Sequence, residues 1–192
     1  MERPMHADTA VPGLSYLPDY LDPGKQTDLL ETIDRLPWLG DLRRRVQHYG
    51  YRYDYSRRKV DHRLFLGPLP SWADSLAEQL LRDGHAPHVL NQLIVNEYLP
   101  GQGISPHVDC IPCFHDTVLS LSLGSSCVMT LSRCDGGHSV QLLLRPGSLL
   151  VMCGEARYEW RHGIAARRND TLAGRRLPRS RRVSLTFRTV LS

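Results

Sequence analysis

The sequence predicts an α+β protein, mainly β, in which a double-layered barrel of short strands follows two N-terminal helices. Two observations lead to this fold class. Apolar residues recur at helical spacing in two stretches before residue 84, and short apolar runs separated by turn residues follow from residue 88 onward. Helices gathered near one end of a chain and strands near the other are typical of an α+β domain.

Length and composition indicate one globular domain. The chain has 192 residues, 41% of them hydrophobic and 23% charged, which is an ordinary balance for a soluble protein. We expect a flexible N-terminus over residues 1–12 and a single domain over residues 13–192. The sequence contains no apolar run long enough to cross a membrane and no apolar segment typical of a secretory signal, so we expect a cytoplasmic monomer.

The two helices have recognisable starts. Asp22 followed by Pro23 predicts a helix that Asp22 caps, and Ser71 is expected to cap a second helix that extends to Leu81. The predicted buried residues of the first helix share helical spacing: Leu29, Leu30, Ile33 and Leu36. Those of the second helix are Leu76, Leu80 and Leu81.

The strands are expected in short runs bounded by glycine, proline and serine. Besides a short strand within residues 14–21 and another within 42–55, the predicted runs are 88–98, 116–123, 127–131, 140–144 and 149–152. A further strand would carry His107 and Asp109, and the last would span 182–188. Residues 165–181 read as a mobile loop.

His107 and Asp109 form the first part of a candidate metal site. Residues two apart on a strand project from the same face, so an imidazole and a carboxylate would stand side by side. The third ligand must come from elsewhere in the chain. Two histidines and one carboxylate on one face of an iron leave positions open for a co-substrate and dioxygen.

Other strands send polar groups toward the same interior. Arg182 and Arg188 would share a strand face, and so would Asn96 and Tyr98. Buried groups of this kind need partners, because an unpaired polar group costs free energy away from water. A metal ion and a small dicarboxylate would supply those partners.

These motifs together resemble the AlkB family of Fe(II)- and 2-oxoglutarate-dependent dioxygenases. The resemblance consists of N-x-Y-x-P-G from Asn96, H-x-D at His107, a distal histidine at His162 and a terminal R-x-x-x-T-x-R from Arg182. It covers the chain from about residue 15 to the end and implies a double-stranded β-helix (jelly-roll) core. Ser184 is a departure, since the family usually has asparagine there.

The resemblance also implies roles for individual residues. His107, Asp109 and His162 would hold Fe(II), and Arg182 would pair with the distal carboxylate of 2-oxoglutarate. The other residues expected at the co-substrate or the metal ligands are Asn96, Tyr98, Ser184 and Arg188. Dioxygen and 2-oxoglutarate would be consumed, succinate would form, and a substrate C–H bond would be hydroxylated.

A tyrosine-rich stretch is the first candidate for substrate binding. Tyrosines alternate from Tyr49 to Tyr55 with arginines around them, and aromatic rings beside arginines can stack an unpaired base. The resemblance implies a lid over a flipped base, with Tyr51, Arg52 and Tyr53 as contacts. The alternative is a half-buried strand whose tyrosines only pack on the core.

The second candidate is the basic C-terminal part of the chain. Residues 151–192 hold 10 arginines and 3 acidic residues, a net charge of +7, whereas residues 1–150 have 14 basic and 17 acidic residues. Such asymmetry suggests a polyanionic partner. Arg167 and Arg168 would contact phosphates with salt-dependent affinity, although a solvated insertion would have the same composition.

The predicted function is therefore oxidation of an alkylated or modified base, by demethylation or hydroxylation, in RNA or single-stranded DNA. RNA is slightly favoured, because residues 118–124 and 147–155 look most like the tRNA-modifying branch of the family. The enzyme alternative is the same iron chemistry on a small molecule or a protein side chain. The non-enzymatic alternative is a nucleic-acid-binding domain with a degenerate metal site.

The cysteines suggest no further chemistry. Their number, five, is odd, which predicts thiols in a reducing compartment and no disulfide framework. Cys110, Cys113 and His115 have the spacing of part of a zinc site, but a second cysteine pair at matching spacing is absent.

Overall fold

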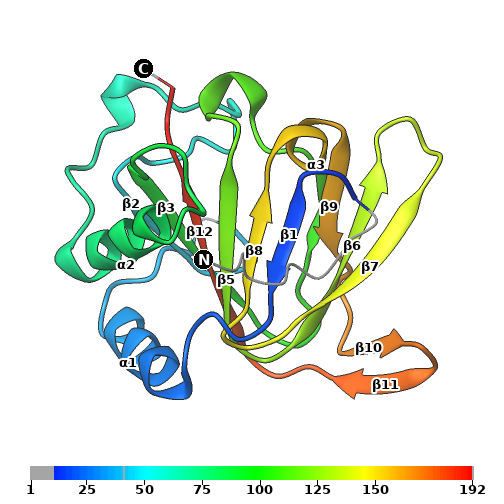
Figure 1. Ribbon diagram of the computed structural model, residues 1–192. Helices are drawn as coiled ribbons and strands as arrows, with labels where there is room; N and C mark the ends of the chain where they lie inside the picture. Colours follow the sequence, from blue (N-terminus) through cyan, green and yellow to red (C-terminus); the bar gives the residue numbers. More distant parts are fainter. Residues whose placement is uncertain (1–10, 41, 192) are drawn as a thin grey trace.

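The protein, seen here as a computed structural model that describes residues 11–40 and 42–191, consists of two antiparallel sheets with two helices outside the larger one (Figure 1). Two single 3₁₀ turns lie at His62–Leu64 and Ile111–Cys113. The helices and strands are β1 Leu14–Leu17, α1 Pro23–Asp34, β2 Val46–Tyr49, α2 Ser71–Arg82, β3 Gln92–Tyr98, β4 Ile104–His107, β5 Val118–Gly124, β6 Cys127–Arg133, β7 Ser139–Leu144, β8 Leu149–Met152, α3 Gly154–Tyr158, β9 Trp160–Ile164, β10 Asn169–Leu172, β11 Arg175–Pro178 and β12 Arg182–Arg188.

The two sheets have the strand orders of a jelly roll. The larger sheet runs β1-β8-β5-β12-β3-β2 and the smaller runs β4-β9-β6-β7, while β10 and β11 form a separate hairpin. Most neighbours in each sheet are distant in sequence, and all pairings are antiparallel. The predicted mainly-β fold with N-terminal helices is confirmed.

Strand alternation divides the larger sheet into an apolar face and a polar face. On β12 the odd-numbered Val183, Leu185 and Phe187 join a core cluster that includes residues of both long helices. The even-numbered residues point to the other face, toward the smaller sheet. That inner face is rich in buried polar side chains: Gln92, Asn96, Tyr98, Ser120, Ser122, Arg182, Ser184 and Arg188.

The first helix begins as predicted and the second does not. The Asp22 carboxylate accepts a hydrogen bond from the Lys25 amide, and Pro23 is the first helical residue. The helix at Ser71 is instead preceded by Pro70, whose carbonyl accepts from the amides of residues 73 and 74. The expectation that Leu81 is buried is also wrong, since it is 37% exposed.

Two predicted strands are shorter than expected. The strand expected over residues 88–98 begins only at Gln92. The one within 42–55 ends at Tyr49, because Gly50 has a φ of +74° and a Cβ there would lie 1.9 Å from the Asn91 carbonyl oxygen. The four alternating tyrosines therefore do not share one strand face.

The segment 165–181 is a hairpin and not the mobile loop we predicted. Strands β10 and β11 pair in register from Asn169 with Pro178 to Leu172 with Arg175. Asp170 is buried beneath this hairpin, where it accepts from Arg179 Nε at 2.6 Å and Arg167 Nε at 2.9 Å. It also accepts from the Val128 amide, which joins the hairpin to β6.

The five cysteines form no disulfide framework, as predicted, but one local pair is bridged, which the sequence did not lead us to expect. Cys110 and Cys113 are joined in a disulfide, while Cys127, Cys134 and Cys153 are free. The bridge closes a loop of adjacent residues and links no distant segments. The zinc reading of Cys110 and Cys113 therefore has no support in this structure.

The N-terminal expectation falls mainly on residues 1–10, which lie outside the described part of the chain. Val11 is buried, and the Pro12 carbonyl accepts from the Ala156 amide. Among the described residues, no helix combines the length and apolar character needed to cross a bilayer.

We predict that Asp170→Asn lowers the free energy of unfolding by about 3 kcal/mol at pH 7, because Arg179 is left buried without a counter-charge. In a protein of this size that corresponds to about 6 to 12 °C in Tm. Burial raises the Asp170 pKa, but Arg179 and the other donors outweigh it and hold the pKa below its usual value. The stabilisation is therefore present at neutral pH and is lost as pH falls through the folded-state pKa, so the difference should shrink below about pH 4.

Asp135→Asn is the matched control, since Asp135 pairs with Arg133 on the surface with 61% of its side chain exposed. We expect it to change stability by less than about 1 kcal/mol. Thermal melts from pH 3 to 8 would measure both variants. If the two substitutions lowered the free energy of unfolding equally at pH 7, the buried ion pair of Asp170 with Arg179 would not stabilise the hairpin as we predict.

Candidate metal centre

Three predicted ligands come together at one end of the smaller sheet. His107 is the last residue of β4 and lies directly opposite His162 on β9, and Asp109 follows two residues later. One ligand atom from each residue lies within 4.8 Å of the other two. The two imidazole rings are 4.4 Å apart, and His107 Nε2 is 3.6 Å from Asp109 Oδ1.

Hydrogen bonding prepares His107 to donate a lone pair. Its Nδ1 atom lies 2.8 Å from the Ser105 carbonyl oxygen. A carbonyl oxygen can only accept, so the proton belongs on Nδ1 and the lone pair on Nε2 faces Asp109. Burial lowers the pKa of His162 to about 4, despite the opposing charge of Asp109, so this ring is neutral near pH 7.

Asp109 stays ionised although it is buried. Arg188 donates to its carboxylate from Nε at 3.1 Å and from Nη2 at 3.3 Å. Burial alone would raise the pKa, but the charge of the Arg188 guanidinium holds the pKa of Asp109 well below its usual value. Two imidazoles and one carboxylate fit a divalent transition metal.

The backbone at Asp109 is fixed by a second buried arginine. Arg157, only 2% exposed, donates from Nη1 to the Asp109 carbonyl at 2.9 Å and from Nη2 to the Cys110 carbonyl at 3.1 Å. Sequence reasoning missed this residue, because nothing marks an arginine in the short helix α3 as an internal one.

Arg182 lies in the interior between the two sheets and has no acidic partner among the described residues. It is 3% exposed, donates to Ser122 Oγ at 2.9 Å, and its guanidinium carbon is 5.4 Å from the centre of the Tyr98 ring. Its Nε proton is buried without an acceptor. A buried guanidinium in this state requires an anion, and a carboxylate matches its planar donors. The site therefore fits a dicarboxylate as well as a metal.

The space beside Arg182 is small in this structure. A cavity of about 10 Å³ lies against Tyr98, Cys127, Ile164 and Arg182, which is enough for about one water molecule. Burial raises the pKa of Tyr98, so its hydroxyl stays protonated and can donate.

The remaining predicted co-substrate residues line the same inner face. Asn96 and Ser184 are buried and directly opposite each other on β3 and β12, and Ser184 also lies opposite Ser122 on β5. Asn96 Oδ1 accepts from Arg44 Nε at 2.9 Å. Arg44 was not among the residues that the sequence predicted for the site. Ser122 was also missed, although serines alternating with leucines along 118–124 were a visible signal.

The tyrosine-rich segment lies partly over the metal centre. Tyr53 packs between Tyr55 at 5.0 Å and Phe114 at 6.2 Å, and Phe114 in turn lies 4.9 Å from the Arg188 guanidinium carbon. Burial, followed by the charge of Asp109, raises the pKa of Tyr53.

The neighbours of Tyr53 differ in their surroundings. Tyr51 packs on Phe65 at 5.0 Å and on the same cluster around Phe114 as Tyr53, and Tyr49 packs on Trp72, which makes Tyr49 part of the core. Arg52 is exposed. Within the predicted substrate set, Tyr51 and Tyr53 therefore both pack beside Phe114, and Tyr53 lies close enough to Asp109 for its charge to act on the tyrosine hydroxyl.

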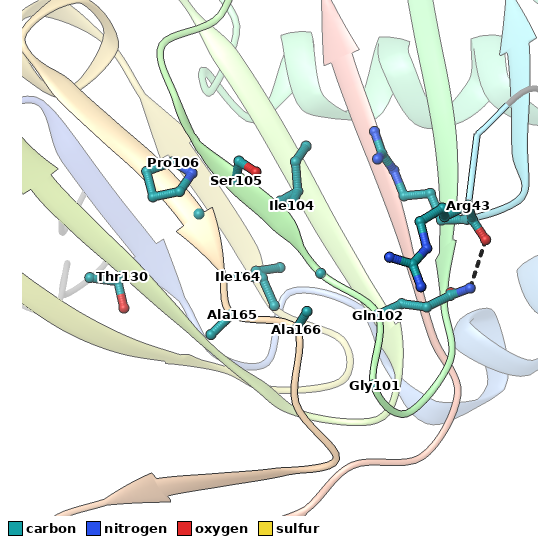
Figure 2. Close-up of a pocket in the computed structure, with 13 residues that line it drawn as sticks. Arg43, Gly101, Gln102, Ile104, Ser105, Pro106, Thr130, Ile164, Ala165 and Ala166 are labelled. Carbon is teal, nitrogen blue, oxygen red and sulfur yellow. Dashed lines mark hydrogen bonds between the residues drawn. The ribbon is translucent and has the colours of Figure 1, made fainter.

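A groove of about 620 Å³ runs beside the triad (Figure 2). Its lining includes residues 101–106, which lead into His107, and residues 163–166, which follow His162. Arg43 and Gln102 lie on one side of it in the close-up, with Ile104 and Ile164 across from them. No triad residue lines the groove itself.

The two predicted phosphate contacts differ in their surroundings. Arg167 is committed to the buried Asp170. Arg168 is exposed, and its side chain lies close to Gly101 at the rim of the groove. Arg168 is therefore free to contact a substrate, whereas Arg167 stabilises the hairpin through its ion pair with Asp170.

The sequence and the fold both have known relatives. A family model for the 2OG-Fe(II) oxygenase superfamily matches residues 37–188. The alkylated DNA repair protein ALKBH8 homolog of Arabidopsis thaliana is 38% identical over 94% of this chain and 59% of its own length. The tRNA (carboxymethyluridine(34)-5-O)-methyltransferase ALKBH8 of Macaca fascicularis is 40% identical over 84% of this chain and 25% of its own length.

This chain thus spans about three fifths of one of these relatives and a quarter of the other. The relative of Danio rerio named probable RNA/DNA demethylase ALKBH6 is 30% identical over 94% of this chain and 87% of its own length. The solved structure of OsALKBH1 has the same fold, with a TM-score of 0.71 at 18% identity over 93% of this chain and 97% of that one. The chain belongs to the 2OG-Fe(II) oxygenase superfamily, in its AlkB-like branch, and is a 2-oxoglutarate-dependent dioxygenase that uses Fe(II) and dioxygen.

Proposed function

We propose that this dioxygenase oxidises an alkylated or modified base in nucleic acid, with RNA slightly favoured over DNA. In this proposal His107, Asp109 and His162 hold the Fe(II). The observation that supports an active dioxygenase site is the buried Arg182 guanidinium, which lacks an acidic partner among the described residues. Arg182 lies on the same inner sheet face as Arg188, which binds Asp109. A protein with only a degenerate metal site would have no need of such a group.

In this proposal, separate residues support the metal site and the 2-oxoglutarate site. Arg188 keeps Asp109 charged and oriented, and Arg157 fixes the backbone that carries it. Arg182 takes the distal carboxylate of 2-oxoglutarate, with Ser122 holding the guanidinium and Tyr98 able to donate its hydroxyl proton. Asn96, with Arg44 bound to it, and Ser184 line the space between. When bound, Fe(II) with 2-oxoglutarate and dioxygen supplies the oxidation of a C–H bond.

The substrate class rests on the relatives and on the tyrosine segment. The names of these relatives refer to alkylated DNA, to a tRNA uridine and to RNA or DNA demethylation. Tyr53 lies close enough to Asp109 to feel its charge and packs on Tyr55, with the exposed Arg52 next to it in the chain, which suits stacking of an unpaired base. The methyltransferase activity in one of those names is not proposed here, because this chain spans a quarter of that protein.

We predict that Arg182→Met raises the KM for 2-oxoglutarate about 100-fold, since about 3 kcal/mol of charged hydrogen bonding is lost. Metal affinity should stay within about twofold, because Arg182 does not touch the triad. The adjacent Arg181→Met is the matched control. Arg181 pairs with Glu97 and Asp34 and should leave that KM unchanged. An unchanged KM in Arg182→Met would refute the assignment.

The proposed substrate class is tested by measuring succinate and formaldehyde with Fe(II), 2-oxoglutarate and air. The panel contains N-methylated single-stranded DNA and RNA, bulk tRNA, a methylated peptide and free methylated nucleosides, with Asp109→Ala as the blank. We expect succinate formation coupled to at least one nucleic acid, with RNA the better substrate. Matched formaldehyde would indicate demethylation, and succinate alone would indicate a stable hydroxyl product. Coupling to the peptide or nucleosides only would overturn the proposal.

A further inference from the structure

The β10–β11 hairpin has a rigid base. The Asp170 carboxylate accepts hydrogen bonds from Arg179 Nε at 2.6 Å and Nη2 at 2.7 Å. Arg179 also donates to the Ala165 carbonyl at 2.8 Å. Both Asp170 and Arg179 are almost fully buried. A short turn with positive φ at Ala173 and Gly174 closes the far end. The hairpin therefore projects from the barrel as a fixed arm (Figure 1).

Three arginines on this arm lack counter-charges. Residues 165–181 contain six arginines and one aspartate, a net charge of +5, and the single aspartate is already used by Arg167 and Arg179. Arg168, Arg175 and Arg176 are exposed, with no carboxylate partner in the described part of the chain. By contrast, four exposed arginines elsewhere lie within 4.0 Å of a carboxylate: Arg35, Arg57, Arg63 and Arg82.

The arm continues the groove beside the metal centre. Gly101 donates its amide proton to the Arg167 carbonyl at 3.2 Å, and the Arg168 side chain lies close to Gly101. The groove lining passes from Pro106 and Gly163, next to the metal ligands, to Ala165 and Ala166 at the start of the arm. Arg43 and Arg44 add positive charge along the same groove.

The lining is suited to a nucleic-acid backbone and not to bases. None of the residues that line the groove is aromatic, and several are glycine or alanine, which allow close approach of a sugar–phosphate chain. Base recognition by stacking is therefore confined to the tyrosines over the triad. What remains along the groove and arm is a row of positive charges, whose attraction to phosphates is independent of sequence and weakened by salt.

We infer that the groove and the β10–β11 arm form a track for the backbone of a single strand on one side of the oxidised nucleotide. The four-residue strands make the arm about 13 Å long, which corresponds to a few nucleotides beyond the groove. This inference rests on the proposed nucleic-acid substrate and specifies where the strand runs. It predicts that affinity grows with the length of the strand, whereas the identity of the flanking bases has little influence.

The test is the double variant Arg175→Ala/Arg176→Ala, compared with Arg35→Ala/Arg82→Ala, which removes the same charge from α1 and α2. Binding of a fluorescein-labelled single-stranded RNA to each protein, loaded with Mn(II) and 2-oxoglutarate without dioxygen, is followed by anisotropy at several KCl concentrations. We expect the arm variant to bind about tenfold more weakly at low salt. The slope of log K against log salt should decrease by about 1.4, from two lost phosphate contacts at about 0.7 each.

The control variant should match the unaltered protein within about twofold and keep its salt slope. The arm variant should also lose kcat/KM on a long oligonucleotide while keeping it on a substrate of one or two nucleotides. If the arm variant kept its RNA affinity and salt slope while the protein still oxidised RNA, the arm would not bind the strand, and the proposed function would stand. If the unaltered protein neither bound nor oxidised any nucleic acid, the proposed function itself would fail.

Discussion

The ion pair between Asp109 and Arg188 is the interaction on which the rest of the site depends. It joins the loop after β4 in the smaller sheet to the end of β12 in the larger one, so it fixes the distance between the two layers. A carboxylate buried at this depth without a counter-charge would take up a proton. With Arg188 present it stays ionised, and an ionised carboxylate beside two imidazoles suits a divalent metal. Arg188 also contacts Gln92 and packs over Phe114, which connects the same ion pair to the tyrosine segment.

Period-two alternation in the strands accounts for both the fold and the chemistry. Strand β12 gives Val183, Leu185 and Phe187 to the helix-covered face and Arg182, Ser184 and Arg188 to the interior. The apolar face supplies the stability that permits buried arginines, asparagine and serines on the other face. A shift of β12 by one residue would exchange the two sets, so the register that buries Leu185 also places Arg182 and Arg188 in the interior.

The parts that followed from the sequence are those governed by local periodicity. The shared face of Arg182 with Arg188, the Asp22 cap and the order of helices and strands could all be predicted from spacing. His107 and Asp109 do meet as predicted, but Asp109 lies in the loop just after β4 and not on the strand that was expected to carry both. The remainder depended on contacts between distant residues. Gly50 ended the tyrosine strand because the Asn91 backbone lies against it, and the basic segment 165–181 became ordered because Asp170 meets Arg179 beneath it. Arg44 and Arg157 act on Asn96 and Asp109 from segments that no spacing rule connects to them.

The most direct test of the central claim is an anaerobic titration of the protein with Fe(II) and 2-oxoglutarate, followed by visible absorption, since a 2-oxo acid bound to Fe(II) gives a charge-transfer band. The account predicts a saturable band at one Fe(II) per chain in the unaltered protein. It predicts no band for Asp109→Ala, and for Arg182→Met a band that appears only at much higher 2-oxoglutarate. Absence of the band in the unaltered protein, or an undiminished band in Asp109→Ala, would contradict the assignment of His107, Asp109 and His162 as the metal site.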